Sequence, residues 1–258
     1  MSYQSSTAEG LAEIGVTLCR SLADLALSAP VTHIYNPLEY AWPGYRAYLE
    51  YAEYRPPVLL VGMNPGPWGM AQTGVPFGDA QMVSTWMGIT APIKKPVHEH
   101  PKRPVQGFDC PRGEVSGQRL WGWAQQRFGS PESFFQNFFV GNYCPLSFME
   151  ASGKNRTPDK LPISERKAVF ARCDQALNET VHLLAPKWVL GIGKFAAARA
   201  EAACQGRDTR IASVPHPSPA SPLANTGWAR LIDVRLDELG CCPATTLATE
   251  KNGIPGVQ

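Results

Sequence analysis

Three polar side chains of this 258-residue sequence stand at or just after the end of a short apolar run. Asn64 follows "PVLLVG", Asn142 lies near the end of "NFFVGNY", and His216 closes "RIASVPH". An asparagine amide donates and accepts hydrogen bonds without titrating, so it can hold a water molecule or read the polar edge of a planar ligand. A histidine can stabilise charge or move a proton near neutral pH. Each of them alone is more often a turn former or a structural residue, and their shared position is what suggests a site.

The loop that carries Asn64 is stiff. From Gly62 to Asp79 it reads "GMNPGPWGMAQTGVPFGD", with five glycines and three prolines. Prolines restrict the backbone, which indicates a loop that holds one side chain in a set direction. Phe77, near the far end, could stack on a planar ligand, although a single aromatic residue more often closes a loop over the core.

These side chains need a frame that brings them together. Four apolar runs have the length of strands, at residues 57–62, 137–143, 187–193 and 210–216, and helical patterns lie between them at residues 116–128, 163–184 and 194–205. Strands separated by helices need crossover connections, which predict an α/β fold with a parallel sheet covered on both faces. Ligands of such sheets bind beyond the carboxyl ends of the strands. We therefore expect a site at the ends of the first, second and fourth strands.

The composition favours one folded domain. Hydrophobic residues make up 44% of the chain and charged residues 18%, as in ordinary globular proteins. We expect a single domain over residues 1–242, which begins with an amphipathic helix, and a disordered tail over residues 243–258. The N-terminal apolar residues recur at helical intervals, so they predict neither a signal peptide nor a membrane span. The net charge of +2 neither requires nor excludes a nucleic acid.

No cofactor or metal site is predicted. The seven cysteines are scattered without a C-x-x-C pair, which indicates free thiols in a reducing compartment rather than an iron–sulfur cluster. "GIGKFAA" around Lys194 lacks the spacing of a phosphate-binding loop, and His98 and His100 lack a second pair of metal ligands. We expect an intracellular protein, in a bacterial cytoplasm and nucleoid or in a eukaryotic nucleus.

Two long motifs give the chain a family resemblance. "GMNPGPWGMAQTGVPFGD" and "HPSPASPLANTGW" resemble the active-site motifs of the single-strand-selective monofunctional uracil-DNA glycosylases, and "EHPKRPV", "EVSGQRLWGW" and "NYCPLSFM" are also similar to that family. The likeness spans residues 32–239. It implies a three-layer α/β/α sandwich around a parallel four-stranded sheet, and an enzyme of base excision repair that acts on single-stranded and duplex DNA. We also expect a monomer.

The resemblance implies an activity and roles for the motif residues. The enzyme would flip a base out of DNA and hydrolyse the N-glycosidic bond of uracil or of 5-substituted uracils such as 5-hydroxymethyluracil. The preference among these bases and deaminated purines stays open. Asn64 would position the attacking water, His216 would stabilise the departing base, Asn142 would read the pyrimidine edge and Phe77 would stack on its ring. The residues implied around the base are Gly62, Met63, Gly66, Met70, Phe77 and Asn142.

The loop at residues 217–227 is the expected wedge that opens the DNA stack. Family members carry a long basic side chain where this sequence has Ala220, and a methyl group cannot fill a vacated base site. Either Leu223 fills it, or the protein depends on single-stranded or weakly paired substrates. The basic segment at residues 94–112 either contacts phosphates or is a solvated loop. The residues expected to contact DNA in the wedge are Pro217, Ser218, Pro219, Ala220, Ser221, Leu223 and Asn225.

Two other functions stay open at this point. One is a protein that holds damaged bases without cutting them, against which the presence of both Asn64 and His216 counts. The other is a small-molecule nucleotide-binding protein, which leaves the wedge-like loop unexplained. Neither motif contains a lysine, which argues against a Schiff base and a strand-nicking step.

Overall fold

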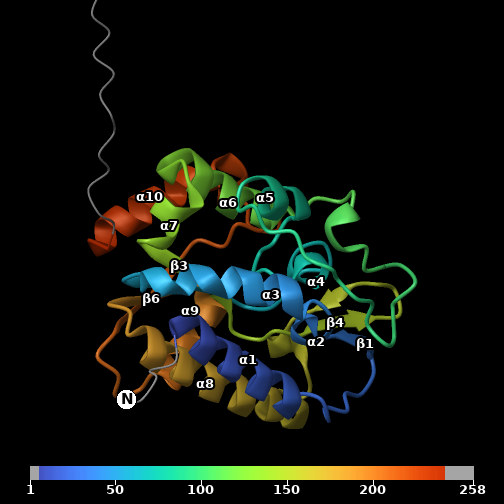
Figure 1. Ribbon diagram of the computed structural model, residues 1–258. Coiled ribbons are helices and arrows are strands. Elements are labelled where there is room, and N and C mark those ends of the chain that lie inside the picture. Colours follow the sequence, from blue (N-terminus) through green and yellow to red (C-terminus); the bar gives the residue numbers. More distant parts are fainter. Residues whose placement is uncertain (1–5, 242–258) are drawn as a thin grey trace, which may run out of the picture.

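A parallel four-stranded sheet forms the centre of the molecule (Figure 1). The computed structural model describes residues 6–241, and the tail expected over residues 243–258 lies outside this range. All four predicted strands are confirmed, and they lie in the order β3-β2-β6-β7. Their bounds are β2 (Val58–Gly62), β3 (Phe138–Asn142), β6 (Trp188–Ile192) and β7 (Arg210–Val214).

β2 is an inner strand, and all five of its residues are buried. It pairs in parallel with β3 on one side and with β6 on the other. The register with β3 sets Gly62 directly beside Asn142. Because the strands run in the same direction, their carboxyl ends and the loops that follow them meet at one edge of the sheet.

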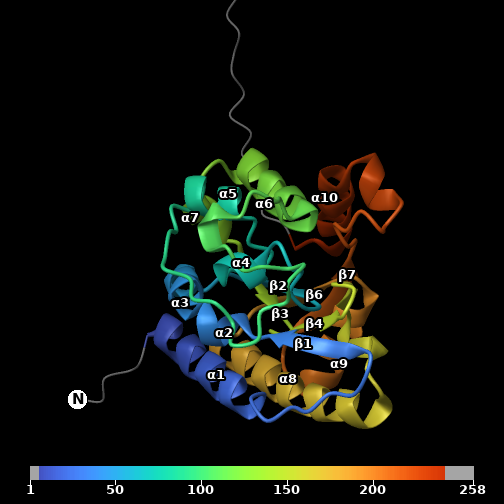
Figure 2. The same cartoon turned by 90° about the vertical axis from the view of Figure 1, so that its right-hand side faces the viewer.

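Helices cover both faces of the sheet, so the predicted three-layer α/β/α arrangement is confirmed (Figure 1). The helices of the first face are α1 (Thr7–Ser21), α8 (Ile163–Leu184) and α9 (Lys194–Ala203). Those of the second face are α5 (Ala80–Thr85), α6 (Val115–Phe128), α7 (Pro131–Phe135) and α10 (Trp228–Leu239). α6 and α10 lie side by side (Figure 2).

Shorter elements complete the chain. The remaining α-helices are α2 (Pro37–Tyr40), α3 (Trp42–Leu49) and α4 (Met70–Thr73). The 3-10 turns are η1 (Glu50–Tyr54), η2 (Gly107–Asp109), η3 (Pro158–Lys160) and η4 (Leu223–Thr226). Of these, α4 and η4 belong to the two motifs that carry the predicted site.

The predicted helices agree closely with the structure. α8 has the predicted bounds, and it ends where Ala185 takes a left-handed conformation ahead of Pro186. α6 begins one residue earlier than expected, and α9 ends two residues earlier. The N-terminal helix is confirmed, with the Ser6 side chain accepting a hydrogen bond from the Glu9 backbone N–H as its cap.

A second, antiparallel sheet was not predicted. Its order is β1-β4-β5, with β1 (Val31–Tyr35), β4 (Ser147–Glu150) and β5 (Asn155–Arg156). Strands of this length show too little alternation to be recognised from the sequence pattern. The sheet matters for function because Asn155, in β5, reaches the cavity described below.

The segment at residues 94–112 is irregular apart from η2, but part of it is buried. His100 is only 1% exposed. Its backbone N–H donates to the Tyr35 hydroxyl at 2.7 Å, and its Nε2 lies 3.1 Å from the Glu150 carbonyl oxygen. A solvated loop, one of the two expectations for this segment, is therefore wrong at His100, which is buried because its polar atoms find partners.

Residues 6–241, which the structure describes, contain neither a cluster of metal ligands nor a membrane-spanning helix. These residues contain no group of three or more histidine, cysteine, aspartate or glutamate side chains that could hold a metal ion. None of the helices in that part of the chain is long and apolar enough to cross a membrane.

Candidate active site

The carboxyl ends of β2, β3 and β7 open into one cavity of about 360 Å³. Asn64, Asn142 and His216 all line it, so the structure brings together the three polar side chains that the sequence singles out. Gly62 does not line it, nor does the wedge loop beyond Ser218. The other predicted site residues in its wall are Met63, Gly66, Met70, Phe77 and Ser218.

The Asn64 amide is held in one orientation. Its Nδ2 donates to the backbone carbonyl oxygen of Leu146, 3.1 Å away. Because a carbonyl oxygen can only accept, the reversed amide would place two acceptors face to face. Oδ1 is therefore the atom that Asn64 leaves for a water molecule or a ligand.

The His216 ring is held as a neutral tautomer. Its Nδ1 lies 3.0 Å from the Ser218 backbone N–H, which is a donor, so Nδ1 must accept and the ring proton is on Nε2. Burial lowers the pKa of His216, which favours the neutral ring. Gly193, at the end of β6, packs beside this ring, and a Cβ there would lie 3.5 Å from His216 Cδ2. The site thus offers one N–H donor without a positive charge.

Gly62 makes room for two predicted substrate-binding side chains. A Cβ at this position would lie 2.5 Å from Asn142 Oδ1 and 2.6 Å from the Phe77 ring. Both distances are shorter than real contacts allow, and both neighbours belong to the wall of the cavity. Gly62 therefore acts on the site by being small rather than by lining it.

Gly62→Ala is expected to destabilise the fold by about 1 to 3 kcal/mol, because the added methyl group overpacks the end of β2. Gly141→Ala is the matched control. Gly141 lies in β3 beside Val61, the residue before Gly62, and a Cβ at Gly141 would meet nothing within 4 Å. Urea unfolding of the two variants and the parent protein measures the difference. Equal stability of the two variants would contradict the packing argument.

Phe77 has an unusual backbone conformation for a bulky residue, with φ at 55°. Three contacts hold it. Trp121 Nε1 donates to the Phe77 carbonyl oxygen at 3.1 Å, and the Asp79 backbone N–H donates to the same oxygen at 2.8 Å. Gly117 approaches so closely that a Cβ would lie 2.0 Å from that oxygen. The backbone that carries the ring is thus fixed by α6 and by its own loop, which limits the directions in which the ring can point.

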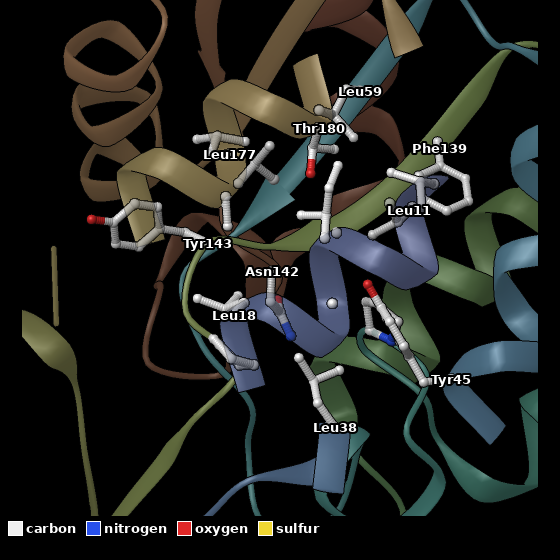
Figure 3. A pocket seen from close by; sticks show the side chains of 18 of the residues that line it. Leu11, Leu18, Leu38, Tyr45, Leu59, Phe139, Asn142, Tyr143, Leu177 and Thr180 are labelled. Carbon is white, nitrogen blue, oxygen red and sulfur yellow. The ribbon is translucent and has the colours of Figure 1, made fainter. Parts of the chain in front are cut away.

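Asn142 stands in the wall between the large cavity and a smaller one of about 70 Å³. Figure 3 shows its side chain pointing into the smaller cavity, near Leu18 and Leu38. Met70 lines both cavities, and its Sδ lies 3.2 Å from Asn142 Nδ2. Sulfur is a weak acceptor, so the amide keeps most of its hydrogen-bonding capacity for a ligand.

Glu114 lines the large cavity but is not among the predicted site residues. Burial raises the pKa of its carboxyl group, the Asp79 carboxylate adds to the increase, and polar groups of Ser116 and Trp68 oppose it. The sequence signal for Glu114 is weak, because an acidic residue directly before a helix is typical of a helix start. The other cavity residues that were not predicted are Pro65, Pro67, Trp68, Gly69, Ser116, Asn155 and Thr157.

The wedge loop is anchored at its base and exposed at its tip. Arg119, in α6, donates to the Pro217 carbonyl oxygen and to Asn225 Oδ1, each at 2.9 Å. Asn225 Nδ2 in turn donates to the Pro219 carbonyl oxygen at 3.0 Å. Ala220 is exposed and Leu223 is 68% exposed. Asn225 is thus a brace within the loop, and Leu223 is its protruding apolar side chain.

Comparison with known proteins identifies the family of the chain. The family model for the uracil DNA glycosylase superfamily matches residues 49–231. The single-strand selective monofunctional uracil DNA glycosylases of Mus musculus and Bos taurus are both 45% identical to the chain over 244 residues. That of Rattus norvegicus is 46% identical over the same length. The alignments cover 93% of this chain and 88%, 90% and 88% of the three relatives.

A solved structure shares the fold. The wild-type SMUG2 of Pedobacter heparinus superposes with a TM-score of 0.62 over 92% of this chain and 98% of its own, at 19% identity. The likeness at this identity speaks for the fold alone, and the assignment rests on the family model and the sequence relatives. This chain belongs to the uracil DNA glycosylase superfamily and, within it, to the single-strand selective monofunctional family.

Proposed function

We propose that the protein is a monofunctional DNA glycosylase that hydrolyses the N-glycosidic bond of uracil and 5-substituted uracils in single-stranded and duplex DNA. The observation that carries the proposal is the convergence of Asn64, Asn142, His216 and Phe77 on one cavity. The relatives are uracil DNA glycosylases by name, which supports the same reaction.

The proposed reaction needs charge stabilisation more than a strong nucleophile. The bond between C1′ and N1 breaks, its electron pair leaves with the base, and water oxygen bonds to C1′. The proton that this water loses passes through solvent to the base anion, which gives free neutral uracil. Asn64 Oδ1 orients that water, but an amide cannot take the proton. His216 Nε2–H donates to the base oxygen on which negative charge develops. Departure of the base therefore dominates the barrier.

Asn142 supplies the reading of the base. Its Nδ2 can donate to uracil O4 while its Oδ1 accepts from N3–H. Cytosine presents amino hydrogens and an unprotonated N3 at the same places, so the same amide would set donor against donor and acceptor against acceptor. Each buried mismatch costs about 1 to 3 kcal/mol, which is enough to exclude cytosine.

The neutral form of His216 gives the reaction a defined pH dependence. Burial lowers the pKa of His216 below its ordinary value of 6.5, so the ring is neutral at pH 7. We expect a flat single-turnover rate between about pH 7 and pH 8, and a fall as the pH drops through the lowered pKa. Protonation would place a second donor on Nδ1 against the Ser218 N–H. In His216→Gln the rate should no longer fall at low pH, whereas in Glu114→Gln it should fall as in the parent protein. If the rate of His216→Gln depends on pH as in the parent protein, His216 is not the group that titrates.

Contacts with DNA would come from the rim of the cavity and from the wedge loop. Arg103 and Arg112 lie over the Trp68 ring, with their Cζ atoms 5.3 and 4.8 Å from its centre. Arg103 also donates to backbone oxygens of Lys102 and Gly153, so Arg112, which is exposed, is the better placed of the two for a phosphate. In the wedge loop, Leu223 would fill the vacated base site that Ala220 cannot.

Leu223→Ala is expected to lower uracil release from duplex DNA by about 3- to 10-fold and to leave release from single strands unchanged, because only the duplex needs a filled gap. Val234→Ala is the control, since it removes a comparable exposed side chain from α10. Single-turnover rates on matched single-stranded and duplex oligonucleotides measure the effect. An equal loss on both substrates would remove Leu223 from the wedge.

Release of free base from an oligonucleotide tests the proposal itself. One sequence context should carry each modified base in turn, single-stranded and duplex, under single-turnover conditions. We expect release of uracil with an intact sugar–phosphate backbone until alkali is added. Tight binding without release would favour the damaged-base-binding alternative, and strand cleavage without alkali would contradict a monofunctional enzyme.

A further inference from the structure

Glu114 explains two glycines of the opening motif. A Cβ at Gly66 would lie 2.5 Å from Glu114 Oε2, and a Cβ at Gly69 would lie 2.9 Å from Glu114 Cγ. The glutamate side chain therefore occupies the space into which side chains at 66 and 69 would project. Because Gly66, Gly69 and Glu114 all line the cavity, this stretch of its wall presents a carboxyl group where the loop itself presents none.

A pocket that takes 5-hydroxymethyluracil faces a problem of discrimination. Thymine, a normal DNA base, carries a methyl group at C5, which is smaller than the hydroxymethyl group. Steric exclusion cannot accept the larger substituent and reject the smaller one. A polar group in the wall can, because a site built to hydrogen-bond a hydroxyl is left with an unpaired buried group when the ligand lacks it.

We propose that Glu114 determines specificity at C5, by accepting a hydrogen bond from the hydroxyl of a 5-hydroxymethyl substituent, whereas a 5-methyl group would cover the carboxyl group and offer it no donor. The inference rests on the proposed function and on the family resemblance, which implies that Gly66 lies near C5 of the flipped base. A single carboxyl group can then accept 5-hydroxymethyluracil and reject thymine. Uracil has no substituent at C5, so a water molecule can occupy the space and donate to the carboxyl group in its place.

The surroundings of Glu114 suit this role. The Asp79 carboxylate, which contributes to the raised pKa of Glu114, already has partners. Its Oδ2 accepts from the Glu114 backbone N–H at 2.9 Å and from Gln118 Nε2 at 3.1 Å. Its Oδ1 accepts from the Met82 backbone N–H at 3.2 Å. Asp79 thus fixes the start of α6, and the Glu114 carboxyl is the acid that lines the cavity. That carboxyl accepts hydrogen bonds from Ser116 and from the Trp68 backbone N–H, and two carboxyl oxygens have lone pairs left for a further donor. Both the ionised and the protonated carboxyl can accept from a hydroxyl group.

The charge of the Glu114 carboxyl group also affects which substituents the pocket accepts at C5. A 5-carboxyl substituent would bring a negative group against the Glu114 carboxyl, and like charges at close range repel. 5-Carboxyuracil should therefore be a poor substrate of the parent protein. Removing the acid while keeping its shape should relieve that repulsion, independently of any effect on 5-hydroxymethyluracil.

The test compares excision of uracil, 5-hydroxymethyluracil, thymine and 5-carboxyuracil by the parent protein, Glu114→Gln and Glu114→Met. In Glu114→Met we expect the ratio of 5-hydroxymethyluracil to uracil release to fall about 10- to 100-fold, whatever the absolute rate of uracil release. Glu114→Gln keeps a polar amide, so its ratio should stay within about threefold. Glu132→Met, which removes an exposed carboxyl of α7 outside the cavity, should leave every ratio unchanged.

The outcomes separate the two proposals. An unchanged ratio in Glu114→Met overturns the role of Glu114, whatever the absolute rates. Absence of all base release from the parent protein overturns the proposed function instead, and the ratio of dissociation constants for oligonucleotides with uncleavable 2′-fluoro nucleotides then tests Glu114 by binding. If Glu114→Met does not fold, Glu114→Gln with 5-carboxyuracil decides: about 10-fold faster release supports the inference, and no change overturns it.

Discussion

Asn64→Ala is expected to slow single-turnover release of uracil by about 100- to 1,000-fold while the dissociation constant for DNA changes by less than about threefold. The reason is geometric. Nδ2 of Asn64 is bound to the Leu146 carbonyl oxygen, so Oδ1 has a fixed direction in which to hold the attacking water. Alanine removes that acceptor without touching groups that bind the base or the phosphates. Rapid-quench measurement of base release and a separate binding titration give the two quantities.

Two variants sharpen this prediction. Asn155→Ala removes another amide from the same cavity. Because Asn155 Nδ2 makes only a long hydrogen bond to the Pro65 carbonyl oxygen, at 3.4 Å, we expect the rate of uracil release to fall by less than about tenfold. Asn64→Asp can accept a proton from water but opposes a carboxylate to the Leu146 carbonyl oxygen, so its effect shows whether base strength or orientation matters more. A near-normal rate in Asn64→Ala would take Asn64 out of the mechanism.

The central sheet could be predicted from the sequence because its strands are continuous apolar runs separated by long helical intervals. β2 and β6 sit between two helical layers, and burial on both faces leaves a plain signal. The antiparallel sheet gives no such signal, since β5 has only two residues. α10 was likewise not predicted, although Trp228, Ile232 and Leu236 recur at helical spacing and are all buried.

The site was predictable as far as its strand ends and its motifs reach. Asn64, Asn142 and His216 could be placed together because parallel strands end at one edge. Glu114 comes from the start of a helix on another layer, and nothing in its local pattern says that its carboxyl turns toward Gly66. Contacts between segments far apart in the sequence need the folded chain. The sequence of the loop indicated that its backbone is rigid, and the structure shows that residues of α6 and Glu114 hold it in place.

The stiffness of that loop has a physical explanation in its neighbours. Gly117 lets α6 approach the Phe77 carbonyl oxygen, and Trp121 donates to the same atom. Glu114 fills the space beside Gly66 and Gly69. α6 thus supports the loop along much of its length, and the glycines are the positions of closest approach. A site that orients one water and one base needs this support, because small displacements of catalytic groups cost large factors in rate.

His216→Ala is expected to slow release of uracil by about 100- to 1,000-fold, because it removes the N–H donor to the departing base. The neutral ring, with Nδ1 accepting from the Ser218 N–H, has its one proton on Nε2 for this purpose. His216→Gln keeps an N–H donor on a side chain of similar reach, so it should recover about tenfold of the loss. Single-turnover rates of the three proteins on one uracil oligonucleotide measure both effects.

The nature of the base separates the role of His216 from that of Asn64. Fluorine at C5 withdraws electrons and makes the departing base a more stable anion, so it needs less help from His216. The deficit of His216→Ala should therefore shrink by about tenfold or more with 5-fluorouracil, whereas the deficit of Asn64→Ala, which concerns the water, should stay nearly the same. If both variants respond equally to fluorine, His216 acts by positioning the site and not by stabilising the charge on the base.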